Sequence, residues 1–460
     1  MKTAVVLAAG PGLRAWPYCG IRQKVTIPVL NTPMVRRLVV DLLALGVEDA
    51  VVVTGCRGEA VRACLGDLDG VRFVHQTAPK GPVDAALTGL APVSSEHVLI
   101  AHGDIVTARE SLQAVMAPVD EGRCAAAALT APTPAGASSW ISVLCGGAGL
   151  IEGVWGQGDR RHPRFAGVLA GNTDRLRRHL ERNPGLMVNV DVGAMPPMEG
   201  ELAYTLQQCV DEGGEALAVS AEGFFVDVDK PWDILEANRA ASEHAFACIE
   251  GIRLAEGAAI DDGAHIDGEF PITLGAGARI GAGCYVRGPV MLGAGAEASR
   301  GAILGANAVI GPNARCTDCA RIGDHSVMGS GCIAGHCAEF SGVAFDGAYL
   351  CHYGSVTGVV GTHVDIGAGT VCGTWRFDNS VKTQNVRGHK ERPERFGSCV
   401  YIGDYTRTGV NAALMPGVKV GCYSCVGAGA VVYDDVPERT LLLVQKEHVH
   451  KPWGPGKYGW

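Results

Sequence analysis

The second half of the chain carries a six-residue repeat that leaves few folds open. Every sixth position from residue 274 to residue 322 holds a small or aliphatic apolar residue. The members of this lattice are Leu274, Ile280, Val286, Leu292, Ala298, Leu304, Ile310, Cys316 and Ile322. One apolar side chain per six residues, often followed by Gly, is typical of a triangular parallel β-helix, whereas Gly-rich low-complexity sequence would not keep the aliphatic residues in phase. We therefore predict a parallel β-helix of hexapeptide repeats over residues 251–435.

The repeat is interrupted and then resumes in a second register. The second register holds Val360, Ile366, Ile402, Leu414, Val420, Val426 and Val432. Where the phase breaks, we expect a loop to leave the coil. The longest break, residues 375–400, is rich in charge, and either a binding loop or a solvated excursion would have this composition. Residues 436–460 are predicted to form a C-terminal tail.

The first half alternates between two kinds of segment. Residues 4–8, 50–54, 71–74 and 97–101 are strand-like and mostly apolar, and residues 34–45 and 59–65 have helical periodicity. Apolar runs of this kind are typical of parallel strands buried on both faces. The alternation predicts a Rossmann-like α/β domain with an open, mostly parallel sheet over residues 1–240. A helix that begins near Pro231 should link the two domains, with its end at residues 241–250.

Composition excludes some partners and favours one compartment. The net charge of −9 provides no global basic surface, so we expect no nucleic-acid partner. No segment reaches membrane-spanning length without charges, so we expect no membrane partner. The chain holds 17 cysteines and shows no secretion signal, which favours free thiols in the cytoplasm.

The first predicted strand runs into a glycine-rich loop that ends in a cation. The loop reads Leu7-Ala8-Ala9-Gly10-Pro11-Gly12-Leu13-Arg14. Glycines after a buried strand let backbone N–H groups approach phosphates, and Arg14 adds a permanently charged, planar fork. Ten residues later Lys24 precedes a strand-like stretch, so two cations flank one loop.

These two segments together resemble the sugar-nucleotide pyrophosphorylase superfamily. The family's motif reads L-A-A-G-x-G-x-R and then P-K-x-x-x-P-V, and Gln23 stands where the family has Pro. The resemblance implies that Arg14 contacts the β- and γ-phosphates of an NTP. It implies that Lys24 contacts the acceptor phosphate and the α-phosphate. The implied nucleotide-binding loop contains Leu7, Ala8, Ala9, Gly10 and Gly12.

Two aspartates extend the resemblance to a metal site. Asp104 follows a predicted strand in His102-Gly103-Asp104, and Asp227 lies in a segment similar to the family's W-x-D-x-G-x-P. The resemblance implies that both carboxylates bind Mg²⁺, which prefers oxygen ligands and takes the rest from phosphates. It also places Gly103 at the nucleotide.

Base and acceptor recognition are less well marked. Gln76 and Gly81 resemble the family's base-reading Q-x-x-x-x-G-T, although Pro82 replaces the Thr. Asn189 either contacts the substrate ring or has a structural role. The sequence therefore leaves the NTP base and the acceptor open.

The order of the two domains resembles the archaeal-type bifunctional uridylyltransferase/acetyltransferases that make UDP-N-acetylglucosamine. Residues 365–378 and 408–418 carry the resemblance in the second domain. It implies a left-handed β-helix, acetyl-CoA as a possible second substrate, and His352 as the general base. His352 lies one residue closer to Gly367 than the family spacing, and Thr374 replaces the family's Asn. His352 is therefore either this base or an ordinary coil histidine, and Lys382 is either substrate-binding or solvated.

The sequence predicts a Mg²⁺-dependent nucleotidyltransferase that joins an NTP to a phosphorylated small molecule, with a sugar 1-phosphate favoured. We expect a homo-oligomer, and the β-helix favours a trimer. The β-helix either acylates the product or serves only in oligomerisation and regulation. A non-catalytic regulatory subunit is a further alternative, against which the joint presence of Arg14, Lys24, Asp104 and Asp227 argues.

Overall fold

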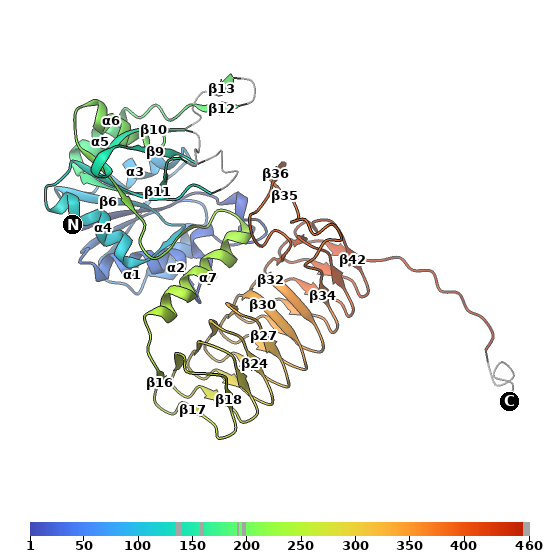
Figure 1. The fold of residues 1–460 in the computed structure, drawn as a ribbon. Coiled ribbons are helices and arrows are strands. Elements are labelled where there is room, and N and C mark those ends of the chain that lie inside the picture. The colour runs from blue at the N-terminus through green and yellow to red at the C-terminus, as the bar shows by residue number, and fades with distance from the viewer. Residues whose placement is uncertain (135–139, 157–160, 191–192, 196–198, 454–460) are drawn as a thin grey trace.

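The computed structural model describes residues 1–134, 140–156, 161–190, 193–195 and 199–453. An α/β domain comes first and a long β-helix second, with helix α7 (Pro231–Ala247) lying between them (Figure 1). No helix within these residues combines the length and the apolar character needed to cross a lipid bilayer.

The α/β domain is built on one mixed sheet. Within the described residues the sheet contains β10 (Ile151–Trp155), β9 (Ser142–Cys145), β11 (Arg164–Asn172), β6 (His97–His102), β1 (Thr3–Ala8), β4 (Asp49–Thr54) and β5 (Val71–His75) in this order, with β8 (Ala126–Ala131) beside β11 and β14 (Ala216–Ser220) beside β8. The neighbours β6, β1, β4 and β5 are parallel, as predicted. The sequence did not indicate that β11 runs antiparallel in the middle of the sheet.

Helices cover both faces of this sheet, which explains the continuous apolar strands. One face packs on α1 (Met34–Ala44), α2 (Gly58–Leu65) and α4 (Arg109–Asp120), and the other on α3 (Pro82–Leu90), α5 (Thr173–Glu181) and α6 (Tyr204–Asp211). Along β1, Ala4 and Val6 belong to the first core and Val5 to the second. Because successive strand residues point to opposite faces, a strand covered on both sides must be apolar throughout.

The second domain is the predicted left-handed β-helix, and its strands stack in three faces. The first face begins with β16 (Ile252–Leu254), β19 (Ile272–Leu274), β22 (Val290–Leu292), β25 (Ala308–Ile310) and β28 (Val327–Met328), and ends with β37 (Val400–Ile402) and β40 (Lys419–Val420). The second face contains β17 (Ala259–Ile260), β20 (Arg279–Ile280), β23 (Glu297–Ala298), β26 (Arg315–Cys316), β29 (Ile333–Ala334), β31 (Tyr349–Leu350), β33 (Asp365–Ile366), β38 (Arg407–Thr408), β41 (Cys425–Val426) and β43 (Leu441–Leu442). The third contains β18 (His265–Ile266), β21 (Tyr285–Val286), β24 (Ile303–Leu304), β27 (Arg321–Ile322), β34 (Val371–Cys372), β39 (Ala413–Leu414) and β42 (Val431–Val432).

The register of these strands accounts for the six-residue repeat. Leu274 pairs with Leu292, and Leu292 pairs with Ile310, so one coil takes 18 residues, or three repeats. The lattice residues are buried and form a single core. The hexapeptide prediction is confirmed.

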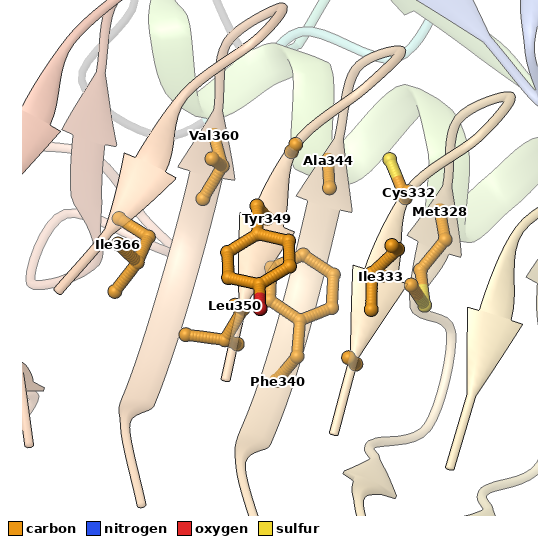
Figure 2. A pocket seen from close by; sticks show the side chains of 11 residues that line it. Met328, Cys332, Ile333, Phe340, Ala344, Tyr349, Leu350, Val360 and Ile366 are labelled. Carbon is orange, nitrogen blue, oxygen red and sulfur yellow. The ribbon is translucent and has the colours of Figure 1, made fainter. Parts of the chain in front are cut away.

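The first break in the repeat is a tightened corner. The inward-facing Phe340 and Ala344 are only four residues apart, within β30 (Glu339–Ala344), and β32 (Ser355–Val360) repeats this step. Both strands span two faces, and a Cβ on Gly342 would lie 2.0 Å from the backbone oxygen of Gly358. The expectation that a loop leaves the coil at each break is therefore wrong here, because glycine lets two strands merge. A residual cavity of about 20 Å³ remains in the interior at this point, and Figure 2 shows the side chains that line it.

The second break does leave the coil, and it reaches the α/β domain. Residues 373–399, here called the excursion, contain a hairpin of β35 (Gln384–Val386) and β36 (His389–Glu391), which Figure 1 shows beside the first domain. Elsewhere the two domains share an apolar core that includes Tyr18 from the first domain and Phe345 from the second. The Tyr18 hydroxyl donates to the Val359 carbonyl at 2.7 Å. The glycine-rich loop and its continuation therefore rest directly on the β-helix.

Candidate functional site

The loop after β1 folds tightly against Lys24. It contains two short 3-10 turns, η1 (Leu13–Ala15) and η2 (Lys24–Thr26), and Gly12 between β1 and η1 has a φ of 63°. A Cβ on Gly12 would lie 2.4 Å from the Cβ of Lys24, so no larger residue fits without displacing the lysine. The second glycine of the motif is thus required by the approach of Lys24 as well as by its backbone conformation.

Gln23, the departure from the family motif, holds this loop together. Its buried side-chain amide donates to the carbonyls of Ala8 at 2.9 Å and Gly10 at 2.6 Å. Its side-chain oxygen accepts from the backbone N–H of Val25 at 2.7 Å. These bonds connect the end of β1 to the turn that carries Lys24.

Two strands bring the predicted metal carboxylates together. Asp104 follows β6 and precedes β7 (Ile105–Thr107), which pairs antiparallel with β15 (Phe225–Asp227) so that Asp227 lies opposite Ile105. The backbone N–H of Val228 donates to the carbonyl of Asp104 at 3.1 Å. Asp104 and Asp227, far apart in sequence, therefore lie side by side at the end of β6.

Lys24 lies among three carboxylates, those of Asp104, Asp227 and Asp229. Its Nζ is 2.5 Å from Oδ2 of Asp104 and 3.4 Å from Oδ1 of Asp229, and its side chain is about 10% exposed. Burial opposes the lysine charge, but Asp104 and Asp229 outweigh it, so the pKa of Lys24 lies above its usual value. Lys24 therefore remains a cation in a site closed to most solvent.

The two predicted metal carboxylates differ in their tendency to ionise. Burial, and next the charge of Asp104, raise the pKa of Asp227 to about 7. Burial also acts against ionisation of Asp104, but Lys24 and His102 overcome it and hold the pKa of Asp104 below its usual value. Neighbouring carboxylates that repel each other are a donor set that a divalent cation would stabilise, and both offer the oxygen ligands that Mg²⁺ prefers.

Arg14 joins this cluster through a residue that sequence reasoning missed. Its Nε lies 3.0 Å from Oδ1 of Asp229, and Lys230 contacts the other oxygen of Asp229 at 3.1 Å. Arg14, Lys24, Asp104 and Asp227 thus lie around Asp229 in one charged cluster. The signal was present in the run Val226-Asp227-Val228-Asp229, where two carboxylates lie two residues apart and the backbone N–H of Asp229 donates to the Asp227 carbonyl at 3.1 Å.

Arg164 is a second cation that the sequence did not single out. It is about 6% exposed, and its guanidinium carbon lies 3.9 Å from the ring centroid of Trp140 and 5.1 Å from that of Phe225. Its charge acts on Asp227, yet its Nε and Nη1 have no hydrogen-bond partner among the described residues. No local motif marks Arg164, because the residues that surround it come from distant segments.

The remaining nucleotide-binding predictions fall in the loops that follow β5 and β6. Gln76 donates to Asp84 Oδ2 at 2.7 Å and to the Gly81 carbonyl at 3.4 Å, so Gln76 and Gly81 belong to one loop. Pro82, the departure from the family, occupies the first turn of α3. The N–H of Gly103 donates to the carbonyl of Leu7 at 2.9 Å. Asn189 lies in β12 (Val188–Val190), and its side chain lies outside the described part of the structure.

His352 lies on the β-helix, in a separate group of side chains. It is exposed at a coil corner with a φ of 61°, and its Nδ1 is 2.6 Å from Nδ1 of His336 on the preceding coil. Nε2 of His336 is in turn 3.9 Å from Oδ2 of Asp318. Lys382 lies in the excursion, and its backbone N–H donates to Ser398 at 3.3 Å. Within the described residues no group of three or more His, Cys, Asp or Glu side chains is arranged to hold a metal ion alone.

The chain is similar to known proteins over both domains. Residues 4–148 match the family described as the MobA-like NTP transferase domain. The bifunctional sugar-1-phosphate nucleotidylyltransferase/acetyltransferase of Sulfurisphaera tokodaii is 25% identical, covering 94% of this chain and 98% of that protein. The bifunctional protein GlmU of Methanococcus maripaludis is 26% identical, covering 97% and 98%. A solved UDP-glucose pyrophosphorylase complexed with UDP-glucose aligns with 53% of this chain and 99% of its own at a TM-score of 0.45 and 16% identity.

Proposed function

We propose that this chain, a nucleotidyltransferase with a MobA-like NTP transferase domain and a left-handed β-helix, joins an NTP to a sugar 1-phosphate and releases pyrophosphate. The observation that carries the proposal is the cluster of Arg14, Lys24, Asp104, Asp227 and Asp229 at the ends of β1 and β6. The Sulfurisphaera tokodaii relative is named a sugar-1-phosphate nucleotidylyltransferase/acetyltransferase, which supports a sugar 1-phosphate as the acceptor.

The proposed reaction is an in-line displacement at phosphorus. A phosphate oxygen of the acceptor attacks the α-phosphorus and forms the new P–O bond. The bond from the α-phosphorus to the bridging oxygen breaks, and pyrophosphate leaves with the electron pair. The attacking oxygen is already anionic, so no protein base is required, and catalysis consists of positioning and charge stabilisation.

Two cations of the cluster have distinct proposed roles. Lys24, which is nearly buried and held as a cation, would bind the acceptor phosphate and the α-phosphate. Arg14 is about half-exposed, and its planar fork would bind the β- and γ-phosphates. Phosphates entering the site would then compete with Asp104 and Asp229 for these two side chains.

Asp104 and Asp227 would hold Mg²⁺ between them. Two carboxylates are sufficient protein ligands for Mg²⁺ when substrate phosphates complete its coordination. The raised pKa of Asp227, caused by burial and by the nearby Asp104, fits a pair of carboxylates that a cation would stabilise. When bound, the ion would neutralise phosphate charge.

A substrate panel tests the proposed function. Each of the common NTPs is incubated with several sugar 1-phosphates and MgCl₂, and pyrophosphate release is measured. We expect release with at least one NTP and one sugar 1-phosphate, and loss of release when EDTA is added. Absence of release from every combination would refute the proposal.

A second activity, acetyl transfer on the β-helix, is favoured by the histidine pair. If Nδ1–H of His352 donates to Nδ1 of His336, then Nε2 of His352 carries a free lone pair and can accept a proton from an amine. His336 Nε2–H would then face Asp318, which would stabilise the pair when it becomes charged. We propose acetyl-CoA as the donor and an amino-sugar phosphate as the acceptor. The alternative, in which the β-helix only assembles subunits, predicts no free thiol from acetyl-CoA.

We further propose a trimer that works in the cytoplasm. Two large apolar side chains in the excursion are exposed: Trp375 is about 80% exposed and Phe377 is fully exposed. Apolar side chains of this size are expected at an interface between subunits. All 17 cysteines are free thiols, which suits a reducing compartment. Sedimentation equilibrium of the full chain would test the trimer.

A further inference from the structure

A cavity of about 520 Å³ lies where the β-helix excursion meets the glycine-rich loop. Its lining comes from both domains and includes Arg14, Trp16 and Arg57 from the first and Arg387, Lys419 and Glu438 from the second. This volume is in the range of small-molecule sites. Of the residues given a role above, only Arg14 lines the cavity, and it also belongs to the charged cluster.

The cavity lining has more positive than negative charge. It contains three arginines and one lysine, against the single carboxylate of Glu438. Lys419 is neutralised by Asp435, at 3.1 Å, and Arg14 by Asp229. Arg57 donates to the Gly20 carbonyl, and neither Arg57 nor Arg387 forms an ion pair with a carboxylate among the described residues. Unpaired guanidinium groups that line one cavity are a recognition pattern for phosphate oxygens.

Arg387 is held in place by the hairpin that carries it. Arg387 and Gly388, with φ values of 51° and 88°, form the two-residue turn between β35 and β36. On one strand, the buried side-chain amide of Gln384 donates to the carbonyls of Gly397 and Gly417 and accepts from Lys419. On the other strand, Glu391 pairs with Lys230 of the first domain at 3.2 Å. The hairpin is therefore fixed to both domains, and its tip faces the cavity.

The cavity continues from the site at which the triphosphate is proposed to bind. Arg14 contacts Asp229, which lies 3.4 Å from Lys24. Pro231 and Trp232, in the first turn of α7, also line the cavity, so the positive end of the helix dipole faces it. The indole rings of Trp16 and Trp232 add apolar area, which strengthens attraction between guanidinium and phosphate by excluding water.

We propose that this cavity binds the pyrophosphate end of the nucleotide, with Arg387 as the guanidinium group contributed by the β-helix and Arg57 as its partner from the α/β domain. The inference rests on the proposed function. It gives the β-helix a direct part in nucleotide binding. The same anion would be held as the β- and γ-phosphates before the reaction and as free pyrophosphate after it.

The test uses the full chain and the variant Arg387→Asn. Asn tolerates the left-handed backbone at this turn, so the variant removes the charge without straining the hairpin. Because a charged hydrogen bond is lost, we expect the affinity for magnesium pyrophosphate, measured by calorimetry, to fall about 10- to 100-fold. We also expect the KM for the NTP to rise by a similar factor while kcat changes less than about threefold.

Two further variants sharpen the result. Arg387→Lys keeps the charge and should recover part of the affinity. Lys390→Ala removes a cation from the same hairpin, at an exposed position that does not line the cavity, and should leave pyrophosphate affinity unchanged. Unchanged pyrophosphate affinity in Arg387→Asn, or an equal loss in Lys390→Ala, would overturn the inference.

A competition experiment identifies the source of the anion. Pyrophosphate is titrated into the chain saturated with a non-hydrolysable NTP analogue, and we expect binding to disappear because the two ligands share the cavity. Undiminished binding that depends on Arg387 would overturn the inference and assign the cavity to a separate phosphorylated ligand. Failure of the proposed function is seen separately, as absence of pyrophosphate release by the wild-type chain, since the titration does not depend on turnover.

Discussion

In the α/β domain the candidate site draws charged side chains from separate segments of the chain, and Lys24 at its centre is nearly buried. In the β-helix the candidate site consists of two exposed histidines stacked on adjacent coils. The first is assembled by an irregular loop and by the pairing of β7 with β15, and the second by a repeat that places equivalent positions above one another.

The buried charged cluster and the exposed histidine pair would promote their reactions in different ways. In the Lys24 cluster, all the charged groups come from one chain, and Lys24 itself is nearly buried and held as a cation. Its electrostatic interactions are therefore strong before substrate binds. The histidine pair offers a proton path from His352 through His336 towards Asp318, but both imidazoles are exposed to water. Substrate or a neighbouring subunit would have to cover the two histidines to exclude water from them. Mutations should therefore affect the two activities independently, and by different amounts.

The largest effect is expected from Asp104→Asn. The change removes a proposed Mg²⁺ ligand and the closest partner of Lys24, so turnover should fall by about 10³-fold or more. Pyrophosphate release with the best NTP and sugar 1-phosphate measures it, and a circular dichroism melt checks that the fold is kept. His352→Ala is the matched control and should release pyrophosphate at the wild-type rate. A near-normal rate in the aspartate variant would refute the metal assignment.

His352→Ala should have a smaller effect, confined to the other activity. Loss of a general base should lower acetyl transfer by about 10²-fold, whereas His336→Ala, which acts through His352, should lower it about tenfold. Free thiol released from acetyl-CoA in the presence of an amino-sugar phosphate is the measurement. Equal losses in the two variants would contradict the assignment of His352 as the base. If the wild type releases no thiol, the acetyl-transfer proposal is wrong, and the β-helix serves only to assemble subunits.

The regular parts of both domains were predictable because their physics is local and periodic. The lattice from Leu274 to Ile322 follows from the repeated need for one inward side chain per strand, and the apolar run in β1 from burial on both faces. The antiparallel β11 was not predictable, since strand direction depends on long-range pairing that leaves little trace in composition. The merged corners at Gly342 and Gly358 looked like an interruption because a missing pair of residues shifts every later inward position.

The candidate site was predictable in part for the same reason. Arg14, Lys24, Asp104 and Asp227 lie in or beside motifs, and the structure places all four in one cluster. Asp229 and Arg164 were missed because their importance comes from what surrounds them after folding. The cavity near Arg387 could not be inferred, since it exists only where the excursion meets the first domain.

A stability effect should distinguish the domain interface from the protein surface. Arg22 Nε lies 3.0 Å from Oδ2 of the fully buried Asp404, and together they join the glycine-rich loop to the β-helix. Asp404→Asn should lower the free energy of unfolding by about 3 kcal/mol, because it leaves a largely buried guanidinium without its carboxylate. Asp67→Asn is the control, since it breaks the exposed pair with Arg36 and should cost much less. Urea denaturation measures both. Equal costs would mean that the interface pair is no more important than a surface one.

The smallest effect is expected for Glu201, a largely buried carboxylate that interacts electrostatically with Arg14. Burial, and next the neighbouring Glu199, raise the pKa of Glu201 to about 7. Because the folded-state pKa lies above that of the unfolded chain, the folded state holds its proton more tightly, and this stabilisation is lost as the pH rises from about 4 to 7. Glu201→Gln mimics the protonated form. It should therefore raise the free energy of unfolding by about 2 kcal/mol more at pH 8 than at pH 5. The exposed Glu59→Gln should show no such pH dependence, and a gain for Glu201→Gln that is equal at both pH values would show that lost charge is not its cause.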